Sequence, residues 1–186
     1  MKRAVDVSGA ALALLIFALP MLIVALFVKL TSKGTVFYWS DRVGQFNIIF
    51  LMPKFRTMRT DTPAVATHLL QDPKSFLTPI GSFLRSTSLD ELPQLWSILV
   101  GDMSFVGPRP ALFNQADLIE LRTQHKVDVL KPGLTGWAQV NGRDELTIAH
   151  KVKLDAEYLN RQTFWFDLKI IYLTFLKVVK KDGVAH

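Results

Sequence analysis

One long apolar stretch dominates the start of the chain. The 22 residues from Val7 to Val28 carry no charge, with Lys2 and Arg3 before them and Lys29 and Lys33 after them. A helix needs about 20 apolar residues to cross a bilayer, so this stretch is long enough to span a membrane. A secretory signal peptide is the competing interpretation, but the run is too long for one and no small-x-small cleavage site follows it.

Two features favour a re-entrant helix over an ordinary spanning helix. Pro20 lies inside the apolar run, where proline removes a backbone hydrogen bond and kinks a helix. Basic residues flank both ends about equally, so the positive-inside rule gives no direction across the membrane. A helix that enters the membrane, bends at Pro20 and returns to the same face accounts for both features. We therefore expect residues 1–33 to form a re-entrant membrane helix.

The next segments read as a hairpin and a loop. Thr35–Ser40 and Phe46–Leu51 are rich in β-branched and aromatic residues, and the insert between them, 41–45, contains a glycine. This arrangement predicts a β-hairpin whose aromatic residues belong either to the core or to the lipid interface. Arg59–Pro79 contains three prolines, and its apolar residues do not recur at a helical or strand spacing. We expect a loop there that could cover an active site.

Apolar residues return at helical spacing in three later segments. These are Leu92–Leu99, Ala111–Val129 and Trp165–Val179. In the first of them, Trp96 is expected in the core. The last segment is interspersed with lysines, so it either packs on the core or lies in the membrane interface with its lysines reaching the head groups. The interface is favoured, because the segment is unusually apolar and aromatic.

These patterns predict a mainly helical α+β fold: a re-entrant membrane helix, a β-hairpin and interfacial amphipathic helices, with residues 34–186 as a cytosol-facing domain.

Hydrophobic residues make up 49% of the 186 residues and charged residues only 20%, which is typical of membrane association. The net charge of +6 suits anionic head groups and anionic substrates. The cations are spread along the chain without an RNA-binding aromatic motif, so we expect no nucleic acid partner. The absence of cysteine excludes disulfides, thiolate catalysis and cysteine-type zinc sites.

The candidate chemistry centres on two adjacent acids, Asp90 and Glu91. Ser88 and Glu91 have the spacing of a capping box, which would make this the start of a helix and nothing more. That cap would place Pro93 in the helix interior, at a cost of about 3 kcal/mol. If Asp90 is the cap instead, Pro93 falls in the tolerated first turn, and both acids lie at the positive end of the helix, where carboxylates and phosphates are favoured.

Arginines flank these acids on both sides. Arg85 lies five residues before Asp90, and Arg109 is held between Pro108 and Pro110. The planar guanidinium group suits phosphate because it donates two parallel charge-assisted hydrogen bonds. Acids beside phosphate-binding arginines would repel the ligand unless a divalent metal or a covalent phospho-aspartate takes part.

The stretch from Leu84 to Pro110 resembles the signature of the monotopic phosphoglycosyl transferases, a family of bacterial sugar transferases. Lys54–Met58 and Lys131–Arg143 match the family as well, and the three matches follow its order along nearly the whole chain. The resemblance implies transfer of a sugar phosphate from a UDP-sugar to polyprenol phosphate in the membrane, through an Asp-Glu pair with Mg²⁺. It also implies the cytoplasmic face of the bacterial plasma membrane.

By the same resemblance, Asp90 is the nucleophile and the residue that holds magnesium, while Glu91 supports the metal, the nucleophile or the acceptor. The residues expected to bind substrate phosphates are Arg85, Arg109, Arg143, Lys54, Arg56 and Asn141. For Lys54 and Arg56 the alternative is a basic patch facing solvent or lipid head groups. For Asn141 it is a simple turn, because Asn-Gly favours a tight bend.

Several alternatives stay open at this point. The short form of the chain and its ending at Lys180–His186 resemble family members that use N-acetylated amino sugars, so we expect an N-acetylated donor. A homodimer is also left open. Two other classes remain: a metal-dependent membrane phosphatase acting on a lipid phosphate, and a non-catalytic membrane-anchored interaction module in which Asp90 is only a cap.

Overall fold

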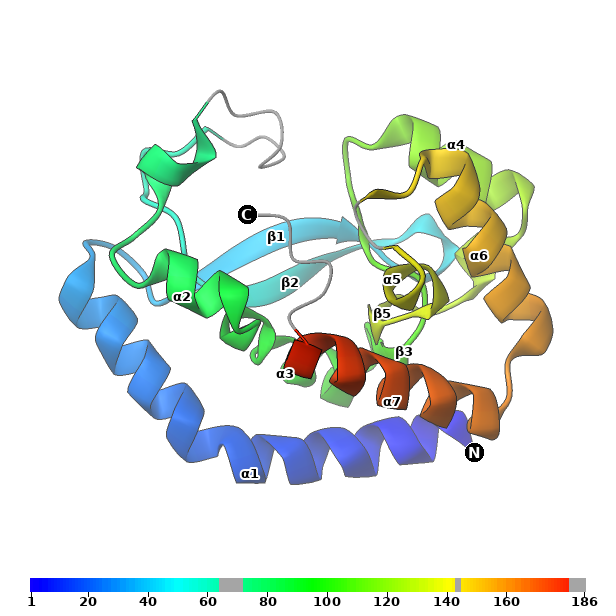
Figure 1. Ribbon diagram of the computed structural model, residues 1–186, viewed down its shortest axis with the longest axis horizontal. Coiled ribbons are helices and arrows are strands. Elements are labelled where there is room, and N and C mark those ends of the chain that lie inside the picture. Colours follow the sequence, from blue (N-terminus) through cyan, green and yellow to red (C-terminus); the bar gives the residue numbers. More distant parts are fainter. Residues whose placement is uncertain (64–71, 143–144, 181–186) are drawn as a thin grey trace.

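The computed structural model describes residues 1–63, 72–142 and 145–180 of the chain, and its elements are arranged as Figure 1 shows. In chain order they are α1 (Lys2–Thr31), β1 (Phe37–Val43), η1 (Gln45–Asn47), β2 (Ile49–Phe55), η3 (Pro73–Phe76), α2 (Gly81–Ser86), η4 (Leu89–Glu91), α3 (Gln94–Val100), β3 (Ser104–Val106), β4 (Ala111–Leu112), α4 (Ala116–Gln124), η5 (Val127–Val129), β5 (Gly133–Thr135), α5 (Trp137–Val140), α6 (Ile148–Arg161) and α7 (Phe164–Lys180). This confirms the predicted mainly helical α+β fold.

The apolar run forms one continuous helix, α1, with Pro20 inside it. The helix runs along one side of the molecule and changes direction between its two halves, as expected where proline interrupts the hydrogen-bond ladder (Figure 1). Ala10 in the first half packs against the core around Ile98, and Val28 in the second half packs against Phe55. Both halves therefore contact the same body.

One face of α1 is exposed along most of the helix. Its exposed apolar side chains are Leu12, Leu15, Ile16, Phe17, Leu19, Leu22, Ile23, Leu26, Phe27 and Leu30. Within the described part of the chain, α1 alone is long and apolar enough to cross a membrane. Such an exposed apolar surface indicates membrane association, because water would oppose it strongly.

The predicted β-hairpin is present, with its strands shifted toward the C-terminus. β1 and β2 pair antiparallel from Phe37 opposite Phe55 to Val43 opposite Ile49. The second predicted strand began too early, because Phe46 and Asn47 adopt left-handed backbone angles and form the turn. β4 pairs with the other side of β1, so β2 is an edge strand and tolerates Pro53 within it. The added length of β2 carries Lys54 toward the candidate site.

The loop predicted between Arg59 and Pro79 is described only in part, since residues 64–71 lie outside the described ranges. The described portion contains η3, and its Leu77 forms a bridge with Met58, the residue just before the loop.

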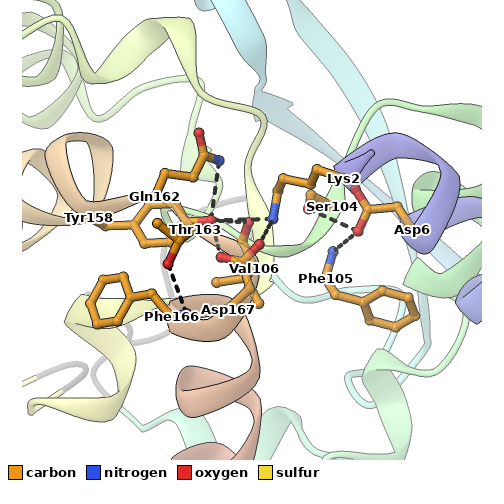
Figure 2. A network of polar contacts seen from close by, with 10 residues as sticks. All are labelled: Lys2, Asp6, Ser104, Phe105, Val106, Tyr158, Gln162, Thr163, Phe166 and Asp167. Atoms are coloured by element: carbon orange, nitrogen blue, oxygen red, sulfur yellow. Dashed lines mark hydrogen bonds and ion pairs between the residues drawn. The ribbon is translucent and has the colours of Figure 1, made fainter.

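A polar network fixes the first turns of α1 to the body (Figure 2). Lys2 Nζ donates to Asp167 Oδ2 and to the Tyr158 hydroxyl, and that hydroxyl donates to Asp167 Oδ1 over 2.7 Å. One turn further along, Asp6 Oδ1 accepts hydrogen bonds from Ser104 Oγ and from the Phe105 backbone N–H. The start of α1 is thereby tied to β3, α6 and α7.

Helix α7 packs on the body through Phe166 and Ile170 and leaves the opposite face uncovered. Its exposed large side chains are Phe164, Trp165, Leu168, Ile171, Tyr172, Phe175 and Val178. Asp167 does not interrupt that face, because it points to Lys2 (Figure 2). Trp96 on α3 is 53% exposed, so the prediction that it belongs to the core is wrong.

A buried ion pair joins α4 to α6. Asp155 is 1% exposed, and its Oδ2 accepts from Arg122 Nη2 at 2.7 Å and from Nε at 3.0 Å. Arg122 Nη1 also donates to the Arg109 carbonyl at 2.9 Å. The pair therefore supports the backbone of a candidate site residue.

Burial raises the pKa of Asp155, but its carboxylate is held by two hydrogen bonds from Arg122. Replacing Asp155 with Asn is expected to cost about 3 kcal/mol, because it leaves the Arg122 charge buried without its partner. The thermal midpoint in detergent should fall by about 10 °C. Glu157→Gln is the matched control, since its pair with Arg161 is exposed and should contribute less than about 1 kcal/mol. Equal midpoints for the two variants would contradict a stabilising role for the buried pair.

Candidate active site

Three segments meet at Glu91. They are the turn η4, which contains Glu91, the strand β2 and the Gly107–Pro110 segment before β4. Glu91 Oε1 accepts from Lys54 Nζ at 2.8 Å and from Arg109 Nη2 at 3.2 Å. The Lys54 and Glu91 side chains are mostly buried, whereas Arg109 is about one-third exposed. The structure thus brings together three of the residues singled out in the sequence.

Neither predicted helix cap forms. Ser88 adopts left-handed angles, φ 56° and ψ 17°, and its side chain accepts no capping hydrogen bond. The chain then makes the short 3₁₀ turn η4, and α3 begins only after Pro93, which has no N–H to continue a hydrogen-bond ladder. Asp90 lies inside η4, so it is not a cap either. Both acids are therefore released from capping, and Glu91 binds cations instead.

The Asp90 carboxyl group lies in a desolvated position. The residue is 8% exposed, and among the described residues no donor makes a hydrogen bond to its carboxylate. Burial raises the pKa of Asp90 to about 6, and the charge of Glu91 adds to that rise, whereas Lys54, Arg85 and Arg109 oppose it. Asp90 is thus ionised at neutral pH and poorly solvated, a state that favours attack on phosphorus or binding of a cation.

Arg85 reaches the same centre from α2. Its Nε donates to Thr57 Oγ1 at 3.0 Å. Burial lowers the pKa of Arg85, and the charge of Asp90 counteracts that shift. Arg85 keeps its positive charge at neutral pH, as arginine does generally.

Arg42 belongs to this cluster, although the sequence did not single it out. It lies on the central strand β1, with Nε donating to Ser40 Oγ and Nη1 donating to the Pro110 carbonyl at 3.1 Å. Burial lowers the pKa of Arg42 to about 10, with a further lowering from Arg109 and an opposing effect of Glu91. No local signal in the sequence marked Arg42, because its place in the cluster depends on the pairing of β1 with both β2 and β4.

The remaining predicted phosphate ligands lie elsewhere or outside the described residues. Arg56 is not part of the cluster around Glu91: it turns toward the end of α1, where Nε donates to the Thr35 carbonyl. Asn141 donates from Nδ2 to the Trp137 carbonyl at 2.7 Å and ends α5, which fits its simple turn role. Arg143 lies outside the described residues.

The charge balance of this centre suits a diphosphate. Among the described residues, four cations, Lys54, Arg85, Arg109 and Arg42, lie near the two carboxylates Asp90 and Glu91, which leaves a surplus of two positive charges. A surplus of this sign attracts anionic substrates into a partly buried site. The carboxylates prevent the cluster from being a purely cationic patch.

The donor set also fits magnesium. Within the described part of the chain no three His, Cys, Asp or Glu side chains form a ready-made cage. Mg²⁺ usually takes one or two carboxylates and completes its shell with water and substrate phosphates. The Asp90 carboxylate, without a hydrogen bond in the described chain, and the adjacent Glu91 match that pattern.

Comparison with known proteins identifies the family of the chain. The family described as "Bacterial sugar transferase" matches residues 1–181. The UDP-glucose:undecaprenyl-phosphate glucose-1-phosphate transferase of Escherichia coli (strain K12) is 42% identical over 189 residues, which cover 95% of this chain and 40% of that protein. The UDP-galactose-lipid carrier transferase of Erwinia amylovora is 37% identical over 203 residues, which cover 98% of this chain and 41% of that protein.

A shorter relative matches along most of its own length. The uncharacterized sugar transferase EpsL of Bacillus subtilis (strain 168) is 39% identical over 186 residues, which cover 100% of this chain and 91% of that protein. The chain thus spans about two fifths of the two longer relatives and nearly all of this one.

Proposed function

The chain belongs to the bacterial sugar transferase family, and we propose that it transfers a sugar 1-phosphate from a UDP-sugar to undecaprenyl phosphate, releasing UMP. The observation that carries this proposal is the buried Asp90 carboxylate, to which no described residue donates a hydrogen bond and which a surplus of cations surrounds. Such a centre can bind a diphosphate and attack it. The product, a polyprenyl diphosphate sugar, would be the first membrane intermediate of polysaccharide synthesis.

The sugar we propose is a neutral hexose, glucose or galactose. Two of the relatives are named for transferring glucose and galactose. The N-acetylated donor expected from the short form of the chain has no support in these names. UDP-glucose and UDP-galactose are therefore the donors to test first.

In the first step the cations bind the diphosphate of the donor, and an Asp90 carboxylate oxygen attacks the sugar-side phosphorus. A new bond forms between that oxygen and phosphorus, and the phosphorus–oxygen bond to UMP breaks. UMP leaves with the bonding electron pair. Because UMP leaves as an anion, Lys54, Arg85 and Arg109 stabilise the charge that develops on it.

In the second step an oxygen of undecaprenyl phosphate attacks the same phosphorus, and the bond to Asp90 breaks. Asp90 regains its negative charge, so the enzyme returns to its starting state. Glu91 holds Lys54 and Arg109 in place through its Oε1 in both steps. Magnesium, held by Asp90 with Glu91 beside it, would neutralise part of the diphosphate charge.

Neither alternative class has a specific observation in its favour. The interaction module required Asp90 to act as a helix cap, whereas Asp90 lies inside η4 and caps nothing. A lipid phosphatase would use the same acids and arginines but would pass the phosphoryl group to water. The reaction products distinguish it from a transferase.

We further propose that α1 is re-entrant and that the body rests on the cytoplasmic face of the plasma membrane, where nucleotide sugars are made. Contacts of both halves of α1 with one body support this arrangement. Lys2, Arg3 and Asp6 bind the body at one end of the helix, and Ser32 accepts from Arg56 at the other. Attachment to one body at both ends favours a placement with both ends on the same side of the membrane.

The absence of cysteine allows a direct test of this topology, because single cysteines can be introduced. Val5→Cys and Lys33→Cys should both react with a membrane-impermeant maleimide in inside-out vesicles, and neither should react in right-side-out vesicles. Leu15→Cys should be protected in both. Reaction of the two flanking cysteines from opposite sides would establish a spanning helix.

The transfer reaction is tested by measuring UMP release from UDP-glucose, UDP-galactose and N-acetylated donors, with and without undecaprenyl phosphate. Donor alone should release about one UMP per enzyme and add the mass of one hexose phosphate to the peptide containing Asp90. Addition of the lipid phosphate should restart turnover. Continuous release of free hexose phosphate without lipid would identify a phosphatase instead.

A further inference from the structure

A second cationic site lies where α1 ends, apart from the candidate active site. A cavity of about 400 Å³ is bounded by the last residues of α1, the segment after β2 and the segment before α2. Its polar lining residues include Ser32, Lys33, Arg56, Arg59, Asp61 and Thr78. None of the cluster around Asp90 and Glu91 lines it. The two sites therefore have different walls.

Arg56 is the buried charge of this cavity. It is 5% exposed, and its guanidinium donates from Nε to the Thr35 carbonyl and from Nη2 to the Ser32 carbonyl. Its Nη1 is buried and has no acceptor in the described chain, and no described carboxylate forms an ion pair with it. A buried charge that is paired only with neutral carbonyls is costly, so an anion nearby would be stabilising.

The rest of the lining is also positive on balance. Lys33 and Arg59 are exposed at the cavity, where an incoming ligand can meet them. Among the described residues that line the cavity, Asp61 is the one carboxylate, and it is already paired with Arg59 through Oδ1 at 3.0 Å and Oδ2 at 2.5 Å. Three cations and one carboxylate leave a surplus of two positive charges.

The position of the cavity identifies the kind of anion. The exposed apolar surface of α1 continues through Phe27 and Leu30 and stops at Thr31, which itself lines the cavity. With the middle of α1 in the bilayer, the cavity lies at the level where the apolar interior gives way to the head groups. That layer carries the phosphates of the lipids.

We propose that this cavity binds the phosphate of an anionic phospholipid head group. The proposal rests on the membrane placement of α1 proposed above, and it does not depend on the transfer reaction. Arginine and lysine side chains at the end of a membrane helix bind lipid phosphate through charge attraction and directed hydrogen bonds.

A lipid phosphate at this site would also hold the candidate active site at a fixed height above the membrane. Thr57 follows Arg56 directly, and its hydroxyl accepts from Arg85 Nε. The Thr57 carbonyl accepts a hydrogen bond from the backbone N–H of Thr78, a residue that lines the cavity. The same short segment thus contacts both sites, so anchoring one side of it positions the other.

The test uses the full-length protein in a neutral detergent and monomeric dihexanoyl-phosphatidylglycerol as the probe. Binding is followed by the rise of the thermal midpoint with probe concentration. Wild type should show a saturable rise, and dihexanoylglycerol, which lacks the phosphate, should show none. Inorganic phosphate should bind at least tenfold more weakly, because it lacks the acyl chains that could pack on the exposed side chains of Phe27 and Leu30.

Variants localise the binding. Lys33→Gln combined with Arg59→Gln should weaken binding of the probe at least tenfold. Both positions are exposed, so folding should be preserved. Arg56→Gln should weaken binding of the probe further. Lys29→Gln is the matched control, an exposed lysine of α1 that does not line the cavity, and Lys54→Gln tests the candidate active site.

Neither of those two controls should change the affinity by more than twofold. Loss of binding in Lys54→Gln with full binding in Lys33→Gln/Arg59→Gln would overturn the proposal, as would equal weakening by Lys29→Gln. Inorganic phosphate that binds as tightly as the lipid would overturn the assignment to a lipid head group. The absence of any saturable shift would overturn the site itself.

Discussion

Asp90→Asn is expected to lower UMP release from the UDP-sugar by about 10⁴-fold or more, the scale of losing a nucleophile. Asparagine has nearly the same size, but it has no ionised oxygen to attack phosphorus. The carboxylate it replaces receives no hydrogen bond from the described residues, so little of the surrounding structure depends on it. Mass spectrometry should find no hexose phosphate on the variant.

The same substitution should make the protein more stable at neutral pH. The pKa of Asp90 is raised from 3.8 to about 6, so the folded state disfavours the ionised form that exists at pH 7. Ionisation therefore costs at most about 3 kcal/mol of folding free energy at pH 7, and Asn avoids that cost. Below pH 6 the wild-type carboxyl group protonates in the folded state, and below 3.8 it is protonated in the unfolded state too.

The thermal midpoints of the two proteins, measured without magnesium, should therefore differ most at pH 7 and converge toward pH 4. Asp102→Asn is the matched control, since Asp102 is exposed and follows α3 closely. It should keep activity within twofold and leave the midpoint unchanged. Activity of Asp90→Asn within tenfold of wild type would assign the nucleophile to another group.

Glu91→Gln is expected to lower kcat/KM by about 100-fold, because removing one partner of a buried charge pair costs about 3 kcal/mol. Glu91 accepts from Lys54 and Arg109 through the same oxygen. Glutamine keeps an acceptor oxygen but loses the charge that balances both cations. The donor diphosphate would then meet cations that are no longer held in place.

Steady-state kinetics with saturating undecaprenyl phosphate measures this effect, and donor-only UMP release separates the first step from the second. Glu157→Gln serves as the control, because its pair with Arg161 lies at the surface and away from this centre. It should stay within twofold of wild type. A Glu91→Gln enzyme with wild-type kcat/KM would show that Lys54 and Arg109 hold their positions without Glu91.

Local patterns along the chain predicted much of the fold. The apolar run, the alternating aromatic segments and the helical periodicity all depend on neighbours within a few residues, so α1, the hairpin and α7 were visible in advance. Their boundaries were less accurate, because tertiary pairing extended β2 to Phe55 and turned Phe46 into a loop residue. Trp96 fitted a core pattern, but the body does not cover that face of α3.

The grouping of the candidate site residues was predicted unevenly for the same reason. Asp90, Glu91, Arg85 and Arg109 lie close together in sequence, and the structure places them together. Arg42 joins them only because β1 is the central strand of its sheet, and Arg56 leaves them because it turns under the end of α1.

Residue chemistry and spacing were thus enough to find the long apolar helix and the acidic pair, since hydrophobicity and charge are properties of the residues themselves. The contacts between segments decided the rest. Left-handed angles at Ser88 freed Asp90 and Glu91 from capping a helix. Burial then raised the pKa of Asp90 to about 6, against the opposing charges of Lys54, Arg85 and Arg109. Burial and charge proximity exist only once distant segments have packed together, so no local pattern could have revealed them.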